Sequence, residues 1–337
     1  MSGPVTETPH RRTAHHEPHR PPLRRVVVTR AALIVATVAA CVVFATSSPY
    51  FLSANNLVNL LNDLALAGIV AIPATFLMMT GHIDLSVGGT AAFTGVLLAA
   101  SAPSYGIFGG LVVAVIGGLV VGLLNGALVT IGRVNNVAST FATMALTRGL
   151  AYLIPSGLAI VLLGFRALGN TEAFWGIALP TVIFGALAVI AALISRGPAG
   201  RRARTIGRVP RERRLALRSE RRWVFGLYVG SALAATLVGL IRTSQLGTGL
   251  PSAGLGMELT VVTAVLLGGG HLAGGRGSVG GTLLALLLIY TINNGLSLAN
   301  VTAYAGQVFT AALLVIALVI DGPLPRRGPS ASSDPVG

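Results

Sequence analysis

Residues 80–90 of this chain read Thr80-Gly81-His82-Ile83-Asp84-Leu85-Ser86-Val87-Gly88-Gly89-Thr90, and they separate two long apolar runs, 57–79 and 91–100. Asp84 is one of only ten acidic residues in the whole chain. A carboxylate between two membrane-length segments is costly unless it lies at an interface or in a water-lined cavity. Because the flanking glycines permit a tight turn, an ordinary polar turn between two helices is the competing interpretation.

The composition is that of an integral membrane protein. Hydrophobic residues make up 53% of the chain and charged residues only 10%, whereas a soluble domain is about 25% charged. The mean hydropathy is +0.79. A single cysteine, Cys41, excludes an intrachain disulfide. We therefore predict an all-α polytopic membrane protein.

Successive apolar segments predict about ten membrane-spanning helices, since about 20 apolar residues cross a bilayer. The spans are predicted at 26–46, 57–79, 85–103, 107–131, 138–156, 174–194, 223–242, 256–269, 278–298 and 303–321. The stretch 256–269 is short and is followed by Gly270, the last of three consecutive glycines. A short or broken helix is expected there, because irregular backbone at membrane depth is tolerated where protein buries it.

The net charge of +14 comes from arginine alone, because all 24 basic residues are arginine. In a soluble protein this charge would suggest nucleic-acid binding, but here the positive-inside rule accounts for it, and no nucleic-acid partner is expected. With the N-terminus inside, the cytosolic segments hold 20 of the 24 arginines. We predict a multi-pass protein of the cytoplasmic membrane with both termini cytosolic: a disordered basic tail (1–25), a membrane domain (26–321) and a second disordered tail (322–337).

Two blocks of sequence resemble the permease subunits of bacterial ribose/xylose/arabinose-type ABC transporters, within the branched-chain amino acid and sugar permease superfamily. The first block is Thr80-Gly81-His82-Ile83-Asp84-Leu85-Ser86-Val87-Gly88. The second is Leu272-Ala273-Gly274-Gly275-Arg276-Gly277-Ser278-Val279-Gly280-Gly281-Thr282, followed by Asn293-Asn294-Gly295-Leu296. The resemblance covers roughly residues 30–321.

The resemblance implies a transport subunit and not an enzyme, with no catalytic, cofactor-binding or metal-binding residues and no cofactor. It implies several partners: an ABC ATPase subunit that hydrolyses ATP, an extracytoplasmic solute-binding protein, a second permease copy as homodimer or heterodimer, a small-molecule sugar and membrane lipid. The chain has no lysine, so a Gly-x-x-x-x-Gly-Lys-[Ser/Thr] nucleotide loop is impossible.

The loop 195–222 is expected to be the ATPase-coupling loop, and it carries eleven arginines against two glutamates. Members of the family usually have an acidic, alanine-rich stretch there, whereas this chain is basic. The coupling residues are expected to be Gly207, Pro210, Arg211, Glu212, Arg213, Arg214 and Leu215. Pro210 is predicted in the first turn of the coupling helix. The alternative is a basic anchor that lies on anionic lipid.

Two signature loops are expected at the cytosolic face. They contain Gly81, Asp84, Ser86 and Gly88 in the first loop and Gly275, Arg276 and Gly277 in the second. Asp84 and Ser86 are candidates to cap the helix that begins near Leu85.

Polar residues within the spans are candidates to line the solute pathway. They are Asn62, Asp63, Asn125, Thr143, Glu258, Asn293 and Asn294, with Thr140 and Thr263 as further polar residues. Polar groups at membrane depth either line a cavity or bond to a neighbouring helix, and the sequence does not distinguish these roles.

The leading hypothesis is import of a pentose-like monosaccharide driven by ATP hydrolysis in another chain. The same superfamily also suggests a nucleoside, a branched-chain amino acid or an autoinducer-like solute. An ATP-independent secondary transporter is the hypothesis from another class, and it predicts coupling carboxylates at mid-membrane and inverted repeats.

Overall fold

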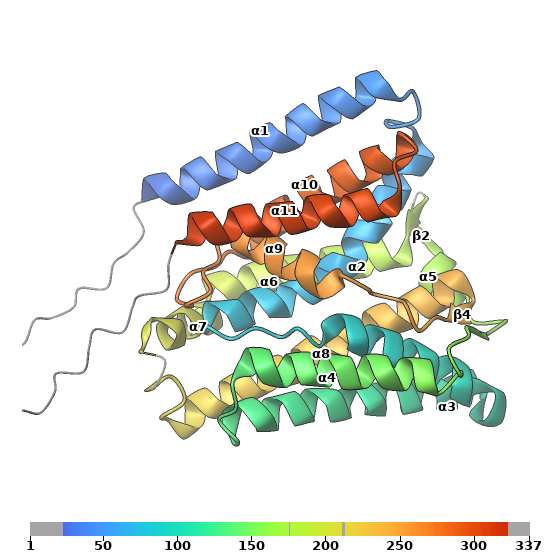
Figure 1. Ribbon diagram of the computed structural model, residues 1–337, viewed down its shortest axis with the longest axis horizontal. Helices are drawn as coiled ribbons and strands as arrows, with labels where there is room; N and C mark the ends of the chain where they lie inside the picture. Colours follow the sequence, from blue (N-terminus) through green and yellow to red (C-terminus); the bar gives the residue numbers. More distant parts are fainter. Residues whose placement is uncertain (1–22, 175, 211–212, 323–337) are drawn as a thin grey trace, which may run out of the picture.

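The computed structural model describes residues 23–174, 176–210 and 213–322 (Figure 1). The helices are α1 (Leu23–Ser47), α2 (Ala54–Met79), α3 (Val87–Thr130), α4 (Asn136–Leu153), α5 (Ala167–Asn170), α6 (Leu179–Arg196), α7 (Pro198–Arg208), α8 (Arg218–Leu246), α9 (Met257–Leu267), α10 (Val279–Leu298) and α11 (Ala303–Asp321). The strands are β1 (Ile160–Val161), β2 (Glu172–Phe174), β3 (Ile177–Ala178) and β4 (Thr248–Gly249). β1 pairs antiparallel with β4, and β2 pairs antiparallel with β3.

The prediction of an all-α polytopic membrane protein is confirmed. Seven helices in the described part of the chain are long and apolar enough to cross a membrane. α3 holds two segments, because Gly106 has a left-handed φ of 70° and breaks the helix. With α3 divided there, and with α4 and the eleven-residue α9 added, ten segments result.

Two of these segments begin inside the bundle (Figure 1). After α2, residues 80–86 turn back along the bundle, and α3 starts in its interior. After α8, residues 247–256 enter from the other end, and α9 starts in the interior. Gly256, with φ 79°, precedes α9, and Gly268 ends it. The short helix predicted at 256–269 is therefore present.

The two halves of the chain repeat one order of elements in opposite directions (Figure 1). α1 corresponds to α6, α2 to α8, the first part of α3 to α9, its second part to α10, and α4 to α11. Each half thus contains one extended segment that leads into one interior half-helix. Discontinuous helices related in this way are a recurring design of membrane transporters.

α2 and α8 form the centre of the bundle. Leu66, Val70, Val238 and Ile241 are among the residues of the main hydrophobic cluster, which also takes in α9 and α10. α1 lies at the edge, and most of its apolar side chains are exposed, as lipid contact requires. The exposed apolar surface is thus a property of the outer helices.

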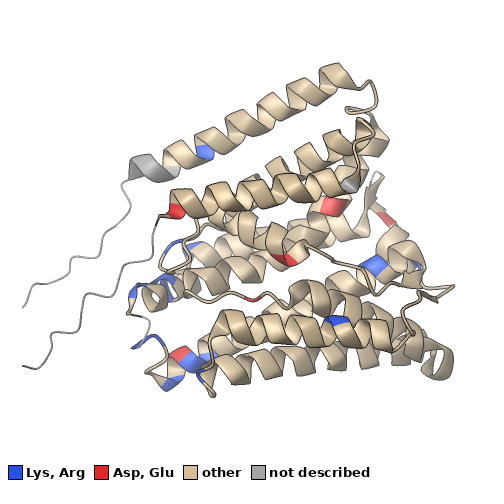
Figure 2. Cartoon of the chain, viewed as in Figure 1, with Lys and Arg blue, Asp and Glu red and all other residues tan. Residues whose placement is uncertain are grey.

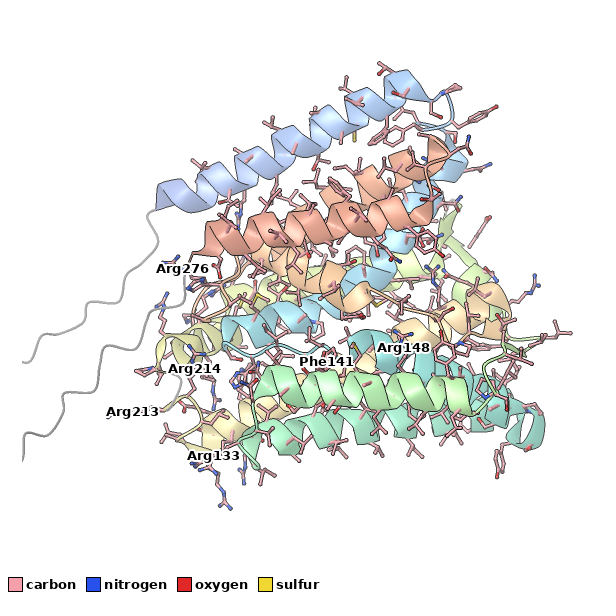
Figure 3. The ribbon with its side chains drawn as sticks, viewed as in Figure 1. Arg133, Phe141, Arg148, Arg213, Arg214 and Arg276 are labelled. Atoms are coloured by element: carbon pink, nitrogen blue, oxygen red, sulfur yellow. The ribbon has the colours of Figure 1, made fainter. Side chains whose placement is uncertain are left out.

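Charge separates the two ends of the bundle (Figure 2). The arginine-rich end is the end where α1 begins and α11 ends, and it holds the arginines of α7, Arg133 and Arg276 (Figure 3), and Arg30, which bonds to Ser278. Arg242 lies toward the opposite end, near the end of α8. The tails predicted at 1–25 and 322–337 fall outside the described residues, except for 23–25 and Gly322.

Candidate functional site

Three loops meet at a glycine junction, formed by Gly81, Gly207, Gly274 and Gly275, at the arginine-rich end. The Gly275 amide donates to the Met79 carbonyl at 2.8 Å. A Cβ atom on Gly207 would overlap both of these backbone groups, and one on Gly274 would lie 2.7 Å from the Gly81 Cα. Gly81 and Gly274 also have left-handed φ values of 78° and 86°. The segments after α2, in α7 and after α9 therefore pack backbone against backbone.

Arg214 closes this junction with a buried guanidinium group. It donates to the carbonyls of Gly207 at 2.9 Å, Val209 at 3.0 Å and Gly81 at 3.4 Å. It also donates to the carbonyl of Ala273. Only arginine offers five donors in a rigid fork, so a single side chain joins all three loops. Arg213, its neighbour in sequence, is exposed (Figure 3).

α7 is amphipathic and packs one face on the bundle. Ala203 and Ile206 are buried beneath it, whereas Arg201, Arg202 and Arg208 are exposed. Arg202 also lies over the Trp223 ring, 5.4 Å from its centroid, and donates to the Ser219 carbonyl at 3.0 Å. The exposed face of α7 is therefore a basic platform.

Within this platform, Arg204 is half-buried and donates to the Ser195 carbonyl at 3.2 Å. Burial lowers the pKa of the Arg204 guanidinium, and the charge of Arg208 adds to that effect.

Pro210 does not lie in the first turn of α7, because α7 ends at Arg208. The coupling role of the loop 195–222 stays a prediction. Pro198 occupies the first turn, where a missing amide hydrogen costs nothing. Proline excludes the helical conformation of the preceding residue, and Val209 is extended with ψ 142°. Arg211 and Glu212 lie outside the described residues.

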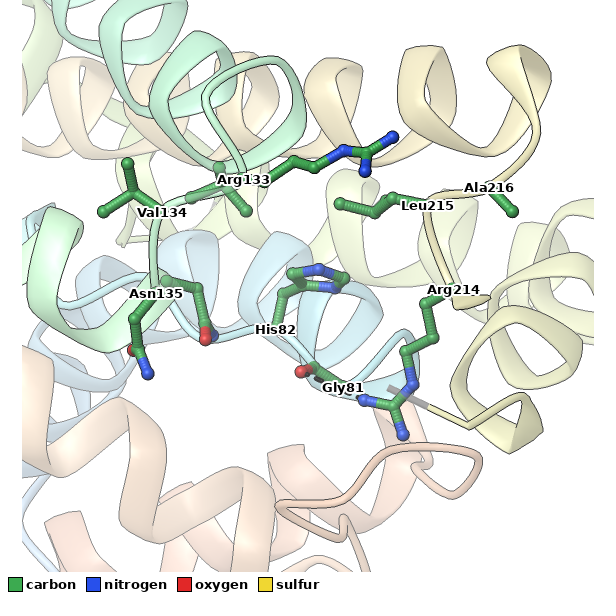
Figure 4. Close-up of a pocket in the computed structure, with 10 residues that line it drawn as sticks. Gly81, His82, Arg133, Val134, Asn135, Arg214, Leu215 and Ala216 are labelled. Atoms are coloured by element: carbon green, nitrogen blue, oxygen red, sulfur yellow. Dashed lines mark hydrogen bonds between the residues drawn. The ribbon is translucent and has the colours of Figure 1, made fainter. Parts of the chain in front are cut away.

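A cavity of about 570 Å³ opens beside the junction (Figure 4). Gly81 and His82 form its floor, with Arg214 and Leu215 on one side and the loop 133–136 on the other. Arg133 adopts a left-handed φ of 55° and extends across it toward Leu215. The cavity is therefore basic and borders the same loops that meet at the glycines.

From this junction, residues 82–86 run into the bundle as an extended segment. The Tyr228 hydroxyl donates to the Ile83 carbonyl at 3.2 Å. Tyr228 lies ten residues into α8, which begins at Arg218, or about 15 Å along the helix. Asp84 and Ser86 are 3% and 0% exposed. Their predicted position in a surface loop is wrong, because the chain continues inward past Gly81 before α3 begins.

The capping prediction is also corrected. Ser86 occupies the N-cap of α3, but its side chain makes no capping bond. Its hydroxyl and its amide both donate to Asp84 Oδ1, at 2.6 Å and 2.9 Å. The Asn125 amide donates to the same hydroxyl at 2.8 Å. The structure thus brings together Asp84 and Ser86 of the first signature loop and Asn125, a predicted pathway residue.

The second half-helix start lies against the first. Arg148 on α4 donates to the carbonyls of Pro251 at 3.0 Å and Ala253 at 2.7 Å (Figure 3). A Cβ atom on Gly88 would overlap Glu258 and lie 3.3 Å from Arg148 Nη2. Gly88 therefore permits the beginnings of α3 and α9 to approach. Gly88 and Glu258 are predicted site residues, whereas Arg148 is not, although it is an arginine within a predicted span and belongs to a stretch, 147–152, that fits the resemblance.

The remaining candidate pathway residues make their contacts away from the starts of α3 and α9. Asn62 accepts a hydrogen bond from Thr181 at 2.8 Å, and Asp63 pairs with Arg242 at 3.3 Å. Asn294 exchanges two amide hydrogen bonds with Asn56, at 2.8 and 2.9 Å.

Two further candidates lie on α4 and α10. Thr143 bonds to a carbonyl of its own helix, and Asn293 lies beside Gly306. The seven residues thus take part in several different helix contacts, and their role in lining a solute pathway stays a prediction.

The chain matches the protein family described as "Branched-chain amino acid transport system / permease component" over residues 56–318. The ribose import permease protein RbsC of Bacillus subtilis (strain 168) is 36% identical over 281 residues, 81% of this chain and 87% of that protein. RbsC of Escherichia coli (strain K12) is 31% identical over 86% of this chain and 92% of that protein.

The L-arabinose transport system permease protein AraH of Escherichia coli (strain K12) is 31% identical over 84% of this chain and 86% of that protein. No solved structure is significantly similar to the chain. These relatives are permeases, which are transport components and not enzymes, so the family predicted from the two sequence blocks is confirmed. Since the match extends from α2 to α11, this multi-pass membrane protein belongs to the branched-chain amino acid transport system permease family.

Proposed function

We propose that this chain is the membrane-spanning subunit of an ATP-driven importer for a pentose-like sugar, in the cytoplasmic membrane. The relatives named for ribose and arabinose import support the solute class. The positive-inside rule supports a cytosolic position for the arginine-rich end, and with it the proposal that both termini are cytosolic. An ATPase subunit binds at this end, and a solute-binding protein delivers the sugar to the other.

The observation that carries this proposal is a continuous mechanical connection from the basic platform to the interior. α7 contributes Gly207 to the glycine junction, and Arg214 bonds the same junction to Gly81. From Gly81 the backbone runs directly to Asp84 and Ser86 in the bundle. Displacement of α7 by an ATPase would therefore be transmitted to the beginning of α3.

The test is co-purification of the tagged permease with the ATPase and binding protein encoded beside it. The complex is reconstituted in liposomes, and ribose, arabinose and xylose are screened for stimulated ATP hydrolysis, with leucine and adenosine as alternative solutes. We expect a pentose to raise turnover. Stimulation by leucine or adenosine alone would assign the other solute class of the superfamily.

The platform is tested by charge reversal. The double variant Arg201→Glu, Arg208→Glu is expected to lose at least tenfold of the ATPase affinity, because both side chains are exposed on α7. Arg166→Glu, exposed at the opposite end, is the matched control. Undiminished ATPase binding in the double variant would identify α7 as a lipid anchor.

The inverted order of elements favours a second candidate, a secondary transporter, because such repeats are common in that class. Uptake that continues in liposomes without ATP or ATPase would support it and would contradict the importer.

A further inference from the structure

The Asp84 carboxyl group is buried with only one of its two oxygens satisfied. Oδ1 accepts two hydrogen bonds from Ser86. Oδ2 is shielded from solvent and has no hydrogen-bond donor among the residues that the structure describes. The side chain is 3% exposed. An ionised carboxylate would therefore bury its charge, with Ser231 on α8 as the described side chain that approaches it besides Ser86.

Two further buried polar atoms also lack a hydrogen-bond partner in the described residues. Asn125 Oδ1 and Ser231 Oγ are both buried and have no hydrogen-bond partner in the described part of the chain. Ser231, on α8, faces the Asp84 carboxyl. The Ser86 hydroxyl proton already goes to Asp84 Oδ1, and the Asn125 amide donates to the Ser86 hydroxyl oxygen.

The described hydrogen-bond donors in this part of the bundle are fewer than the acceptor oxygens. Asp84 Oδ2 faces one uncommitted hydroxyl proton, that of Ser231, and Asn125 Oδ1, on the amide group that donates to Ser86, has no donor in the described residues. An additional proton on Asp84 Oδ2 removes the buried charge and makes this oxygen a donor beside the Ser231 hydroxyl. An ordered water could supply donors, but it would not remove the charge.

No charged group in the described residues compensates Asp84. Tyr228 on α8 is a neutral phenol that donates to the Ile83 carbonyl. The His82 ring bonds to the Thr80 hydroxyl at 3.0 Å and meets the Tyr228 ring edge-on. Arg148 is engaged by the carbonyls of the 247–256 segment. Burying an unpaired carboxylate costs far more than protonating it.

A metal ion fits this place less well than a proton does. The described residues contain no group of three or more His, Cys, Asp or Glu side chains that could hold one. A proton needs no cavity and only one carboxyl oxygen.

We propose that Asp84 is a proton-binding site, and that it carries the proton on Oδ2 as a neutral acid in the conformation described here. The hydrogen bonds that it then donates and accepts join the first half-helix to α8. When segment 82–86 becomes accessible to water, Asp84 releases the proton. Closing of the interior therefore takes up one proton, and acid favours the conformation described here by up to about tenfold per pH unit.

The experiment uses the full-length permease in lipid nanodiscs, with ¹³C-carboxyl-labelled aspartate, and infrared spectroscopy at pH 7. The chain has only four aspartates, Asp63, Asp84, Asp321 and Asp334. We expect an isotope-shifted C=O band of a protonated aspartic acid. It should be lost in Asp84→Asn and retained in Glu258→Gln, which alters the other interior carboxyl group with an unpartnered oxygen.

A second variant keeps the test decisive if Asp84→Asn does not fold. Ser231→Ala removes one hydroxyl beside the carboxyl and is expected to shift the band without abolishing it. A spectrum with only ionised aspartates would overturn the proposal, as would a band that persists in Asp84→Asn. Stabilisation by sodium relative to choline, without a protonated band, would identify a cation instead. None of these readouts requires transport, so the result is independent of the proposed importer.

Discussion

Arg214 is one of eleven arginines in residues 195–222, yet its surroundings differ from those of its neighbours. It is buried and donates to carbonyls in three loops, whereas Arg213 beside it is exposed. A buried guanidinium that satisfies main-chain carbonyls rigidifies the backbone that it joins. The glycine junction is therefore held by one side chain as well as by close backbone packing.

Arg214→Gln is expected to lower the free energy of unfolding by about 2–3 kcal/mol, because carbonyls at the junction lose a charged donor. Thermal unfolding of the purified permease measures this change. Arg213→Gln is the matched control and should stay within about 0.5 kcal/mol of the wild type. Equal effects of the two substitutions on the free energy of unfolding would contradict the role of Arg214 in holding the glycine junction.

The role of Arg214 could not be predicted from the sequence. The motifs singled out Gly81, Gly207 and Gly275, which the structure brings together at the glycine junction. Their mutual contact depends on segments far apart in the chain, and no local pattern encodes it. Arg213 and Arg214 are identical residues in the same basic run, so only the tertiary fold separates the exposed arginine from the buried one.

At the scale of elements, the half-helices α3 and α9 depend on the connecting segments that precede them. Residues 247–256 include two short turns, closed by the Ala253 and Leu255 amides at 3.0 and 3.3 Å. Arg148 fixes this segment from α4 through the carbonyls of Pro251 and Ala253. One side chain from a third helix thus positions the start of α9.

Arg148→Gln should accelerate hydrogen exchange of the Ala253 and Leu255 amides at least tenfold, because two charged hydrogen bonds are weakened. Mass spectrometry of peptides covering 250–256 measures the rate. Arg166→Gln, at an exposed position, serves as the control and should leave these amides unchanged. Unchanged exchange in Arg148→Gln would show that α9 is positioned by packing alone.

Most element types were predictable, and the interior segments were not. Hydropathy located the spans to within about five residues, and the span predicted at 174–194 begins later, at α6, because β2 and β3 occupy Glu172–Phe174 and Ile177–Ala178. Periodicity could not show that 80–86 enters the bundle. Apolar residues such as Ile83 and Leu85 suit an interior segment and a helix start equally well, and burial of Asp84 depends on partners in α3 and α8.

At the scale of the whole molecule, the arginine-rich end defines an orientation that labelling can test. In a Cys41→Ser background, which removes the only cysteine, single cysteines are placed at exposed positions as Thr205→Cys on α7 and Ser104→Cys near Gly106. A membrane-impermeant maleimide added to intact cells should label the Ser104→Cys variant. The Thr205→Cys variant should react only after permeabilisation. The reverse pattern would invert the proposed topology.

The position of α1 has a consequence for assembly during synthesis. α1 packs mainly on α10, with Phe44 against Gly295 and Arg30 donating to Ser278 at 2.8 Å. These partners lie about 250 residues apart in the chain. At about 5–20 residues per second, the ribosome needs roughly 10–50 seconds to supply α10 after α1 has entered the bilayer. The first helix to be made must therefore remain alone in lipid until α10 is available. Its outward-facing valines and isoleucine suit contact with lipid. Its docking is among the last steps of folding.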